Sequence, residues 1–253
     1  MTFENTLEFA RQCDAEDGLK NLSGRFHFPE IHGKETIYLT GNSLGLLPKK
    51  AREYVEQEFL DWANFGVEAH FDAKNPWFYY HHFCEEALAK LVGAKKEEVV
   101  AMGSLTNNLH LLMVSFYRPT KQRYKIMMES NAFPSDQYAM ETQVKYHGFD
   151  PEHAIIEIKP RAGENALRTE DIVHAIEENK NELATIMFGG VNYLSGQLFD
   201  IKTITEAGHK AGAIVGFDLA HAVGNAILQL HDWKVDFACW CSYKYLNSSP
   251  GGI

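Results

Sequence analysis

A carboxylate and a lysine follow two consecutive apolar segments late in the sequence. Asp218 comes directly after the run Ala213–Phe217, and Lys244 comes directly after the run Phe237–Tyr243. If both runs are neighbouring strands, the two side chains meet at one edge of a sheet. This is what a pyridoxal phosphate site requires, with a lysine that holds the cofactor covalently and a carboxylate that keeps its ring nitrogen protonated. On spacing alone, a surface ion pair between Asp218 and Lys244 is equally compatible.

A second segment has the composition of an anion site. In Gly103–Asn107 the hydroxyls of Ser104 and Thr106 stand between an expected strand and an expected helix. Backbone N–H groups at a helix N-terminus favour a phosphate. The simpler interpretation is a serine that caps the helix, because such caps are common.

An aromatic residue opens another expected helix. Phe133 precedes Pro134, Ser135 and Asp136, so its ring could stack on a flat cofactor. Taken alone, Phe133 is more typical of a hydrophobic contact at a helix entry, and Asp136 of an acid that complements the helix dipole.

The segments between these residues alternate between strand and helix patterns. Apolar runs predict strands over 99–104, 124–130, 154–160, 183–190, 213–219 and 237–243. Helical spacing predicts helices over 105–117, 135–148, 169–180 and 201–212. This alternation favours an α/β fold, with a mostly parallel sheet covered by helices on both faces. Ligands of such sheets bind at the carboxyl ends of the strands.

Bulk properties narrow the class of protein. The chain has 253 residues and a formal net charge of −10, which argues against nucleic acid as a partner. No stretch approaches the roughly 20 apolar residues of a membrane span, and the first residues lack the apolar core of a secretion signal. The four cysteines have no paired spacing, so we expect reduced thiols and a cytoplasmic protein. Cys239 and Cys241 are more typical of buried strand thiols than of a metal or redox site.

Several long segments together resemble kynureninase. They are 38–45 (YLTGNSLG), 131–136 (NAFPSD), 190–192 (GVN), 216–225 (GFDLAHAVGN), 231–233 (HDW) and 236–247 (DFACWCSYKYLN). The likeness covers almost all of the chain from about Thr36. It is specific, because other enzymes of the same fold share only the Asp, the His and the Lys.

The resemblance implies a fold type I pyridoxal phosphate enzyme, active as a homodimer, that cleaves L-kynurenine with water to anthranilate and L-alanine. 3-Hydroxykynurenine is a further expected substrate, and the reaction belongs to tryptophan catabolism and NAD biosynthesis. Lys244, Asp218 and Tyr243 become the expected catalytic residues. The expected cofactor pocket consists of Leu105, Thr106, Phe133, Pro134, Ser135, Asp136, Gly189, Asp218, His221, Tyr243 and Lys244. Ser43 and His70 match positions that face the substrate, and no metal is expected.

The resemblance also implies a domain organisation. Residues 1–48 would form an N-terminal arm and a segment of the small domain, and residues 49–253 a cofactor-binding large domain. The family's chains continue well beyond Lys244, so we expect this sequence to be truncated before the C-terminal small domain. The missing part should carry the arginine for the substrate's carboxylate, so the 253 residues alone are expected to be inactive.

One position departs from the family pattern. The family often has Ser where this chain has Gly189. A lost hydroxyl there would weaken cofactor binding by about 0.5–1.5 kcal/mol, the net value of one hydrogen bond. A backbone N–H group is a possible substitute.

Three other interpretations remain open. A cysteine desulfurase or an aminotransferase would share Asp218 and Lys244 but should lack the long match over 237–247. A metal hydrolase would need a ligand pattern that the 12 histidines do not form. A non-catalytic remnant would bind the cofactor weakly or not at all.

Overall fold

The computed structural model describes residues 3–252, and the chain forms two compact units. The first extends to Phe78 and the second begins at Tyr79. The assignment of residues 1–48 to an arm and a small-domain segment, and of residues 49–253 to a large domain, stays a prediction. The helices and strands of the first unit are α1 (Leu7–Glu16), η1 (Lys20–Arg25), β1 (Phe26–His27), β2 (Glu30–Ile31), β3 (Lys34–Glu35), β4 (Leu47–Pro48), α2 (Ala51–Phe65), η2 (Gly66–Glu68) and α3 (Ala69–Asp72). Helix η3 (Trp77–His82) runs across the division.

The second unit is built on a five-stranded sheet in the order β6-β5-β7-β8-β9, with every neighbouring pair parallel. Its strands are β5 (Lys125–Glu129), β6 (Ile155–Ile158), β7 (Leu183–Gly189), β8 (Ile214–Asp218) and β9 (Phe237–Cys239). Its helices are α4 (Glu85–Val92), η4 (Lys96–Glu98), α5 (Leu105–Phe116), α6 (Pro134–Tyr146), α7 (Pro151–Ala154), α8 (Thr169–Asn179), α9 (Ile201–Lys210) and α10 (Leu230–Trp233). The predicted parallel α/β class is confirmed.

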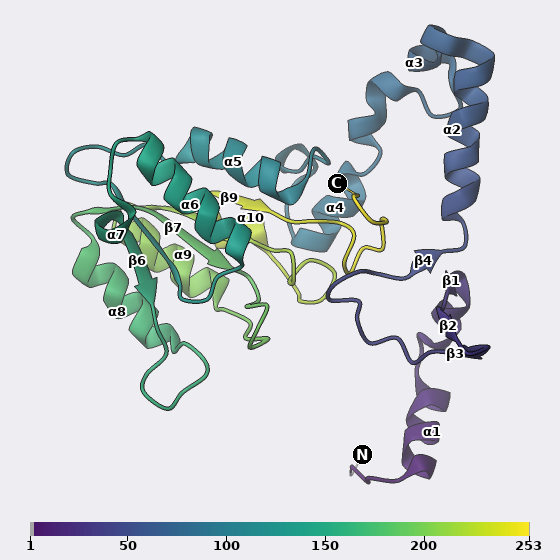
Figure 1. Ribbon diagram of the computed structural model, residues 1–253, viewed down its shortest axis with the longest axis horizontal. Coiled ribbons are helices and arrows are strands. Elements are labelled where there is room, and N and C mark those ends of the chain that lie inside the picture. The colour runs from purple at the N-terminus through teal and green to yellow at the C-terminus, as the bar shows by residue number, and fades with distance from the viewer. Residues whose placement is uncertain (1–2, 253) are drawn as a thin grey trace. The chain divides into compact units, whose positions relative to one another are not determined.

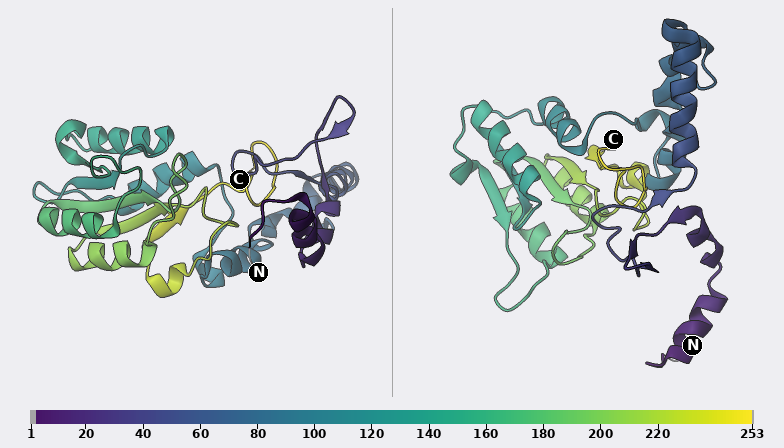
Figure 2. Two further views of the ribbon diagram at one scale, coloured as in Figure 1. Left: turned by 90° about the horizontal axis from the view of Figure 1, so that it is seen from below. Right: turned by 45° about the vertical axis from the view of Figure 1, so that its right-hand side comes forward.

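Helices cover both faces of this sheet (Figures 1 and 2). Helices α5 and α6 lie on one face and place Leu109, Met113 and Met140 in one buried cluster with the sheet. Helices α8 and α9 cover the other face, where Ile172 and Ile204 belong to a second cluster. The amphipathic helical patterns of the sequence thus become the two layers that bury the sheet.

The strand expected over residues 99–104 is absent from the observed sheet, so that prediction is wrong. Val99 has an extended backbone, but a strand also needs a ladder of hydrogen bonds to a neighbour. Within residues 3–252 this segment has no such ladder. Residues 99–102 instead line an apolar groove together with residues 237–240.

The last predicted strand is shorter than expected. Strand β9 ends at Cys239, whereas the apolar pattern predicted a strand to Tyr243. The reason is its partner: β8 ends at Asp218, which pairs with Cys239. Lys244 therefore lies on a segment beyond the ladder and not at the strand's last residue.

Gly216 allows β8 and β9 to pack closely. A Cβ atom added at Gly216 would lie 2.2 Å from ring atoms of Phe237, and that ring stacks on Phe116 of α5 with centroids 4.9 Å apart. The glycine is required here by space.

We predict that Gly216→Ala lowers the free energy of unfolding by about 1–3 kcal/mol, the usual cost of overpacking. Chemical denaturation measures the change. The same substitution in a Phe237→Leu background should cost clearly less, because the smaller side chain can move. An equal cost in both backgrounds would contradict the packing explanation.

Candidate active site

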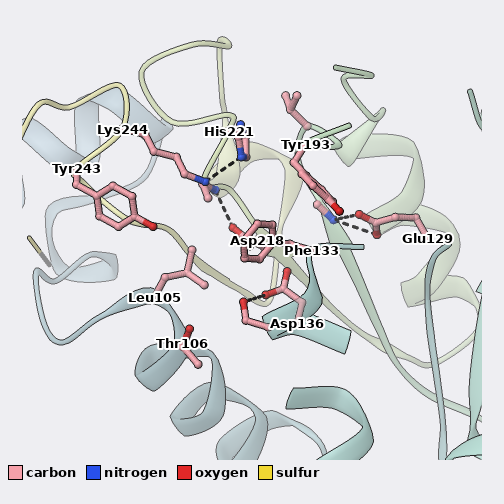
Figure 3. Close-up of a pocket in the computed structure, with 14 residues that line it drawn as sticks. Leu105, Thr106, Glu129, Phe133, Asp136, Tyr193, Asp218, His221, Tyr243 and Lys244 are labelled. Atoms are coloured by element: carbon pink, nitrogen blue, oxygen red, sulfur yellow. Dashed lines mark hydrogen bonds between the residues drawn. The ribbon is translucent and has the colours of Figure 1, made fainter. Parts of the chain in front are cut away.

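The carboxyl ends of the strands surround one pocket in the second unit (Figure 3). Its lining residues come from α5, β5, α6, β7, β8 and the segments that follow β5, β7, β8 and β9. They are Leu105, Thr106, Glu129, Phe133, Ser135, Asp136, Gly189, Val191, Tyr193, Asp218, Ala220, His221, Tyr243 and Lys244. Of the cofactor-site residues expected from the sequence, ten line this pocket. Pro134, the first residue of α6, is not among them.

Asp218 and Lys244 are both buried, each only 8% exposed, so they are not a surface ion pair. The Lys244 amine lies 2.8 Å from Nε2 of His221 and 5.7 Å from the centroid of the Phe133 ring. Burial, followed by the charge of Lys244, lowers the pKa of His221. The Nε2 atom of a neutral imidazole can accept a hydrogen bond from the Lys244 amine.

The backbone fixes the orientation of Asp218. Its Oδ1 accepts a hydrogen bond from the N–H of Ala220 at 2.7 Å, and its carbonyl oxygen accepts one from Gly190 at 2.7 Å. Burial raises the pKa of Asp218, while hydrogen bonds from Asp136 and Ala220 and the charge of Lys244 oppose that rise. The carboxyl group therefore has a fixed direction.

Two more buried acids lie beside Asp218. Burial, followed by repulsion from Asp218, raises the pKa of Asp136 to about 9. Burial also raises the pKa of Glu129 to about 7, against hydrogen bonds from its own N–H and that of Gly189. At neutral pH Asp136 is thus a neutral acid that can donate its proton to the Asp218 carboxylate, because adjacent buried carboxylates do not all ionise together.

The N-terminus of α5 forms another wall. Leu105 and Thr106 line the pocket, so backbone N–H groups in the first turn are near its rim. Ser104 is the cap of this helix and accepts a hydrogen bond from the N–H of Asn107 at 3.4 Å. The capping role proposed for Ser104 is confirmed, and Thr106 carries the hydroxyl that lines the pocket.

The aromatic wall comes from Phe133 and Tyr193. Their rings meet edge to face, with centroids 5.1 Å apart, and Phe133 remains 45% exposed. Beside them, the Ser135 hydroxyl donates to Oδ1 of Asp136 at 3.3 Å. Because the Phe133 ring centroid is 5.7 Å from the Lys244 amine, this exposed ring forms the wall of the pocket near the lysine.

The N–H of Gly189 donates to both carboxylate oxygens of Glu129, at 3.0 and 3.2 Å. That a backbone N–H substitutes for the missing hydroxyl toward the cofactor stays a prediction. Glu129, Val191, Tyr193 and Ala220 line the pocket but were not expected from the sequence. Glu129 could have been found by the rule that identified Asp218, since it is a carboxylate at the end of an apolar strand.

The remaining expected residues have separate surroundings. Tyr243 lines the pocket, and burial together with a hydrogen bond to Cys241 raises its pKa to about 12, so the phenol stays protonated. Ser43 and His70 lie in the first unit, where Nδ1 of His70 is 2.8 Å from the Val67 carbonyl oxygen. Their role toward a substrate stays a prediction.

Neither a metal cluster nor a membrane-spanning helix occurs in the described part of the chain. Within residues 3–252, no three His, Cys, Asp or Glu side chains are grouped so as to hold a metal ion. None of the helices there combines the length and apolar character needed to cross a membrane. Cys239 and Cys241 are buried free thiols.

The donor set fits the cofactor expected from the sequence. A buried lysine amine, a buried oriented carboxylate and an aromatic ring face one pocket, with a helix N-terminus at the side. The family model for Aminotransferase class-V matches residues 37–253. The chain belongs to this family.

Curated relatives that are similar over nearly the whole chain are kynureninases. That of Flavobacterium psychrophilum is 62% identical over 251 residues, which is 99% of this chain and 59% of the relative. That of Myxococcus xanthus is 56% identical, with 99% and 59% covered, and that of Mus musculus 47% identical, with 96% and 55% covered. The chain thus spans rather more than half the length of these relatives.

Solved structures support the fold. A cysteine desulfurase from Thermococcus onnurineus has a TM-score of 0.69 at 20% identity, and the match covers 100% of this chain and 57% of that one. A cysteine desulfurase from Escherichia coli has a TM-score of 0.68 at 15% identity, with 100% and 57% covered. At these identities the likeness concerns the fold alone.

The raised pKa values predict how stability depends on pH. Glu129 and Asp136 bind protons more strongly in the folded chain than in the unfolded chain, so unfolding releases protons. The free energy of unfolding of the cofactor-free protein should therefore fall as pH rises, by up to about 1.4 kcal/mol per pH unit for each such group. The pH range over which stability falls begins at the ordinary pKa range of carboxyl groups. It ends at about pH 7 for Glu129 and at about pH 9 for Asp136.

Urea unfolding between pH 5 and pH 9 measures this slope. Asp136→Asn should flatten it most above pH 7, where Glu129 no longer contributes. The exposed Glu152→Gln serves as the matched surface control. A slope that Asp136→Asn leaves unchanged above pH 7 would show that Asp136 does not retain a proton there.

Proposed function

We propose that this chain is the cofactor-binding part of a kynureninase that uses pyridoxal 5′-phosphate. The observation that carries the proposal is the pocket in which Lys244, Asp218 and His221 meet, together with the identity to kynureninases over nearly the whole chain. A cysteine desulfurase or aminotransferase activity has weaker support, because the similar desulfurases share only 15–20% of residues.

The cofactor, when bound, supplies an electron sink that stabilises negative charge at the carbon next to its amine. Lys244 would hold the cofactor covalently, and Asp218 would keep a proton on the ring nitrogen. Phe133 would stack on the ring, and Leu105 and Thr106 at the start of α5 would hold the phosphate. Ser135, Asp136 and His221 would complete the pocket.

The same residues can move protons during the reaction. The Lys244 amine, once released by a substrate amine, would remove the proton from the substrate's α-carbon, and its hydrogen bond to His221 holds it in place. Tyr243 keeps its proton at neutral pH because its pKa is about 12, so it would return a proton to the β-carbon after the carbon–carbon bond breaks. Ser43 and His70 would face the substrate.

The wider setting follows from the same proposal. The substrates would be L-kynurenine and 3-hydroxykynurenine, the products anthranilate or 3-hydroxyanthranilate and L-alanine, and the setting tryptophan catabolism and NAD biosynthesis. The enzyme would be a cytoplasmic homodimer without nucleic-acid or membrane partners. Because the 253 residues alone are expected to be inactive, the direct test uses this chain extended through the C-terminal part that its relatives have, incubated with pyridoxal phosphate and kynurenine. Equal amounts of anthranilate and alanine support the proposal, and sulfur release from cysteine would favour the desulfurase alternative.

We expect Lys244→Ala to abolish covalent binding of the cofactor, because Lys244 is the lysine that lines the pocket. The visible absorption band of the lysine-linked cofactor should disappear. The exposed Lys202→Ala is the control and should keep the band. If Lys244→Ala still incorporates cofactor at a single site after borohydride reduction, Lys244 is not the attachment point.

Asp218→Ala should impair chemistry more than cofactor occupancy, since the phosphate and ring contacts remain. The charged hydrogen bond contributes about 1.5–3 kcal/mol to binding, whereas proton removal loses its main electrostatic support. Exchange of the substrate's α-proton into deuterated water reports the chemistry. Rapid exchange by a cofactor-loaded Asp218→Ala protein would refute the role of this carboxylate.

A further inference from the structure

Glu129 occupies the space that a side chain at position 189 would need. A Cβ atom added at Gly189 would lie 2.9 Å from Oε1 of Glu129 and 3.4 Å from the carbonyl oxygen of Val191. Gly189 has no positive φ, so its backbone conformation does not require glycine. A side chain at position 189 would therefore meet the Glu129 carboxyl group, which would have to move.

The Glu129 carboxyl group is fixed by the same neighbour. It is 3% exposed, and both oxygens accept from the N–H of Gly189. The two residues end the adjacent strands β5 and β7, and Figure 3 shows the carboxyl group aimed at the end of β7. A carboxylate on one strand thus holds the terminal peptide of the next.

This contact continues to Asp218 through the sheet. Gly189 is the register partner of Asp218 in the β7–β8 pair, and the next N–H, that of Gly190, donates to the Asp218 carbonyl oxygen at 2.7 Å. A shift of the β7 end would therefore move the backbone that carries Asp218. Glu129 is connected to Asp218 by two consecutive hydrogen-bonded steps.

We propose that Glu129 is a positioning residue of this site, which takes the side-chain place of residue 189 and fixes the end of β7, and with it Asp218. The inference rests on the proposed cofactor function. It assigns to Glu129 and Gly189 a joint role: the carboxyl group at 129 and the absent side chain at 189 depend on each other. Ionised Glu129 also adds negative charge beside Asp218, which favours a positively charged ring on the ligand.

The first experiment is a double-mutant cycle on thermal unfolding of the cofactor-free full chain. Gly189→Ser should lower the melting temperature in the wild-type background, because its side chain meets the Glu129 carboxyl group. In a Glu129→Ala background the same substitution should lower it by less than half as much. Additive shifts in melting temperature would show that residues 129 and 189 do not depend on each other, and would overturn that part of the proposal. This experiment needs no cofactor, so its result holds even if the protein fails to bind pyridoxal phosphate.

The second experiment measures the dissociation constant of pyridoxal phosphate from pH 6 to pH 8.5 in the wild type and in Glu129→Gln. Glutamine keeps the shape and one acceptor but cannot ionise. The other titratable groups that line the pocket are Asp136, Tyr193, Asp218, His221, Tyr243 and Lys244, and they are common to both proteins. The titration of the ligand and of the groups that do not interact with Glu129 cancels in the ratio of the two constants, whereas Asp136 and Asp218 interact with Glu129 and belong to its effect.

We expect the ratio to be near one at pH 6, where Glu129 is protonated, and the wild type to bind several-fold more tightly at pH 8.5. A role limited to stability would give a ratio that does not change with pH, and that result would overturn the claim that the ionised Glu129 carboxylate favours a positively charged ligand. If the wild type binds no pyridoxal phosphate, the proposed function fails, and the unfolding cycle alone then decides whether Glu129 positions the end of β7.

Discussion

The register of the parallel strands determines everything else at this site. Gly189 pairs with Asp218, and Asp218 pairs with Cys239, so three strands end at the same level and their following segments enter one pocket. A shift by one residue would turn Asp218 to the opposite face of the sheet, since side chains alternate along a strand. The buried clusters on both faces oppose such a shift, because the packing of side chains such as Phe217 and Phe237 in them would be lost.

This arrangement concentrates buried charge at one sheet edge. Three buried acids, Glu129, Asp136 and Asp218, line one pocket with Lys244, the one buried lysine in the part of the chain from 3 to 252. Burying charges without partners is costly, and the raised pKa values show that protons offset part of this cost. A flat, partly cationic ligand with a ring proton would replace some of these protons. The same electrostatics that destabilise the empty pocket therefore favour the proposed cofactor.

Much of this could be predicted from sequence, for identifiable reasons. The period of apolar residues revealed the helices and most strands, and the strand-end rule placed Asp218 and Lys244 together. The prediction of a strand over 99–104 was wrong because a strand needs a partner far away in the sequence, and the local pattern of apolar residues does not show whether one is present. The prediction for β9 was too long for the same reason, because the hydrogen-bonded pairing of β9 stops where its partner β8 ends. Glu129 ends an apolar strand, so the strand-end rule could have identified it, but its contact with Gly189, 60 residues away in sequence, has no local signal.

The function proposed for this chain depends above all on Lys244, which the strand ends would bring to the place where the cofactor is held. The most direct measurement is peptide mapping by mass spectrometry of the wild-type protein after incubation with pyridoxal phosphate and reduction with borohydride. We expect a single modified peptide, the one that contains Lys244. Modification spread over exposed lysines, with the Lys244 peptide unlabelled, would contradict this role.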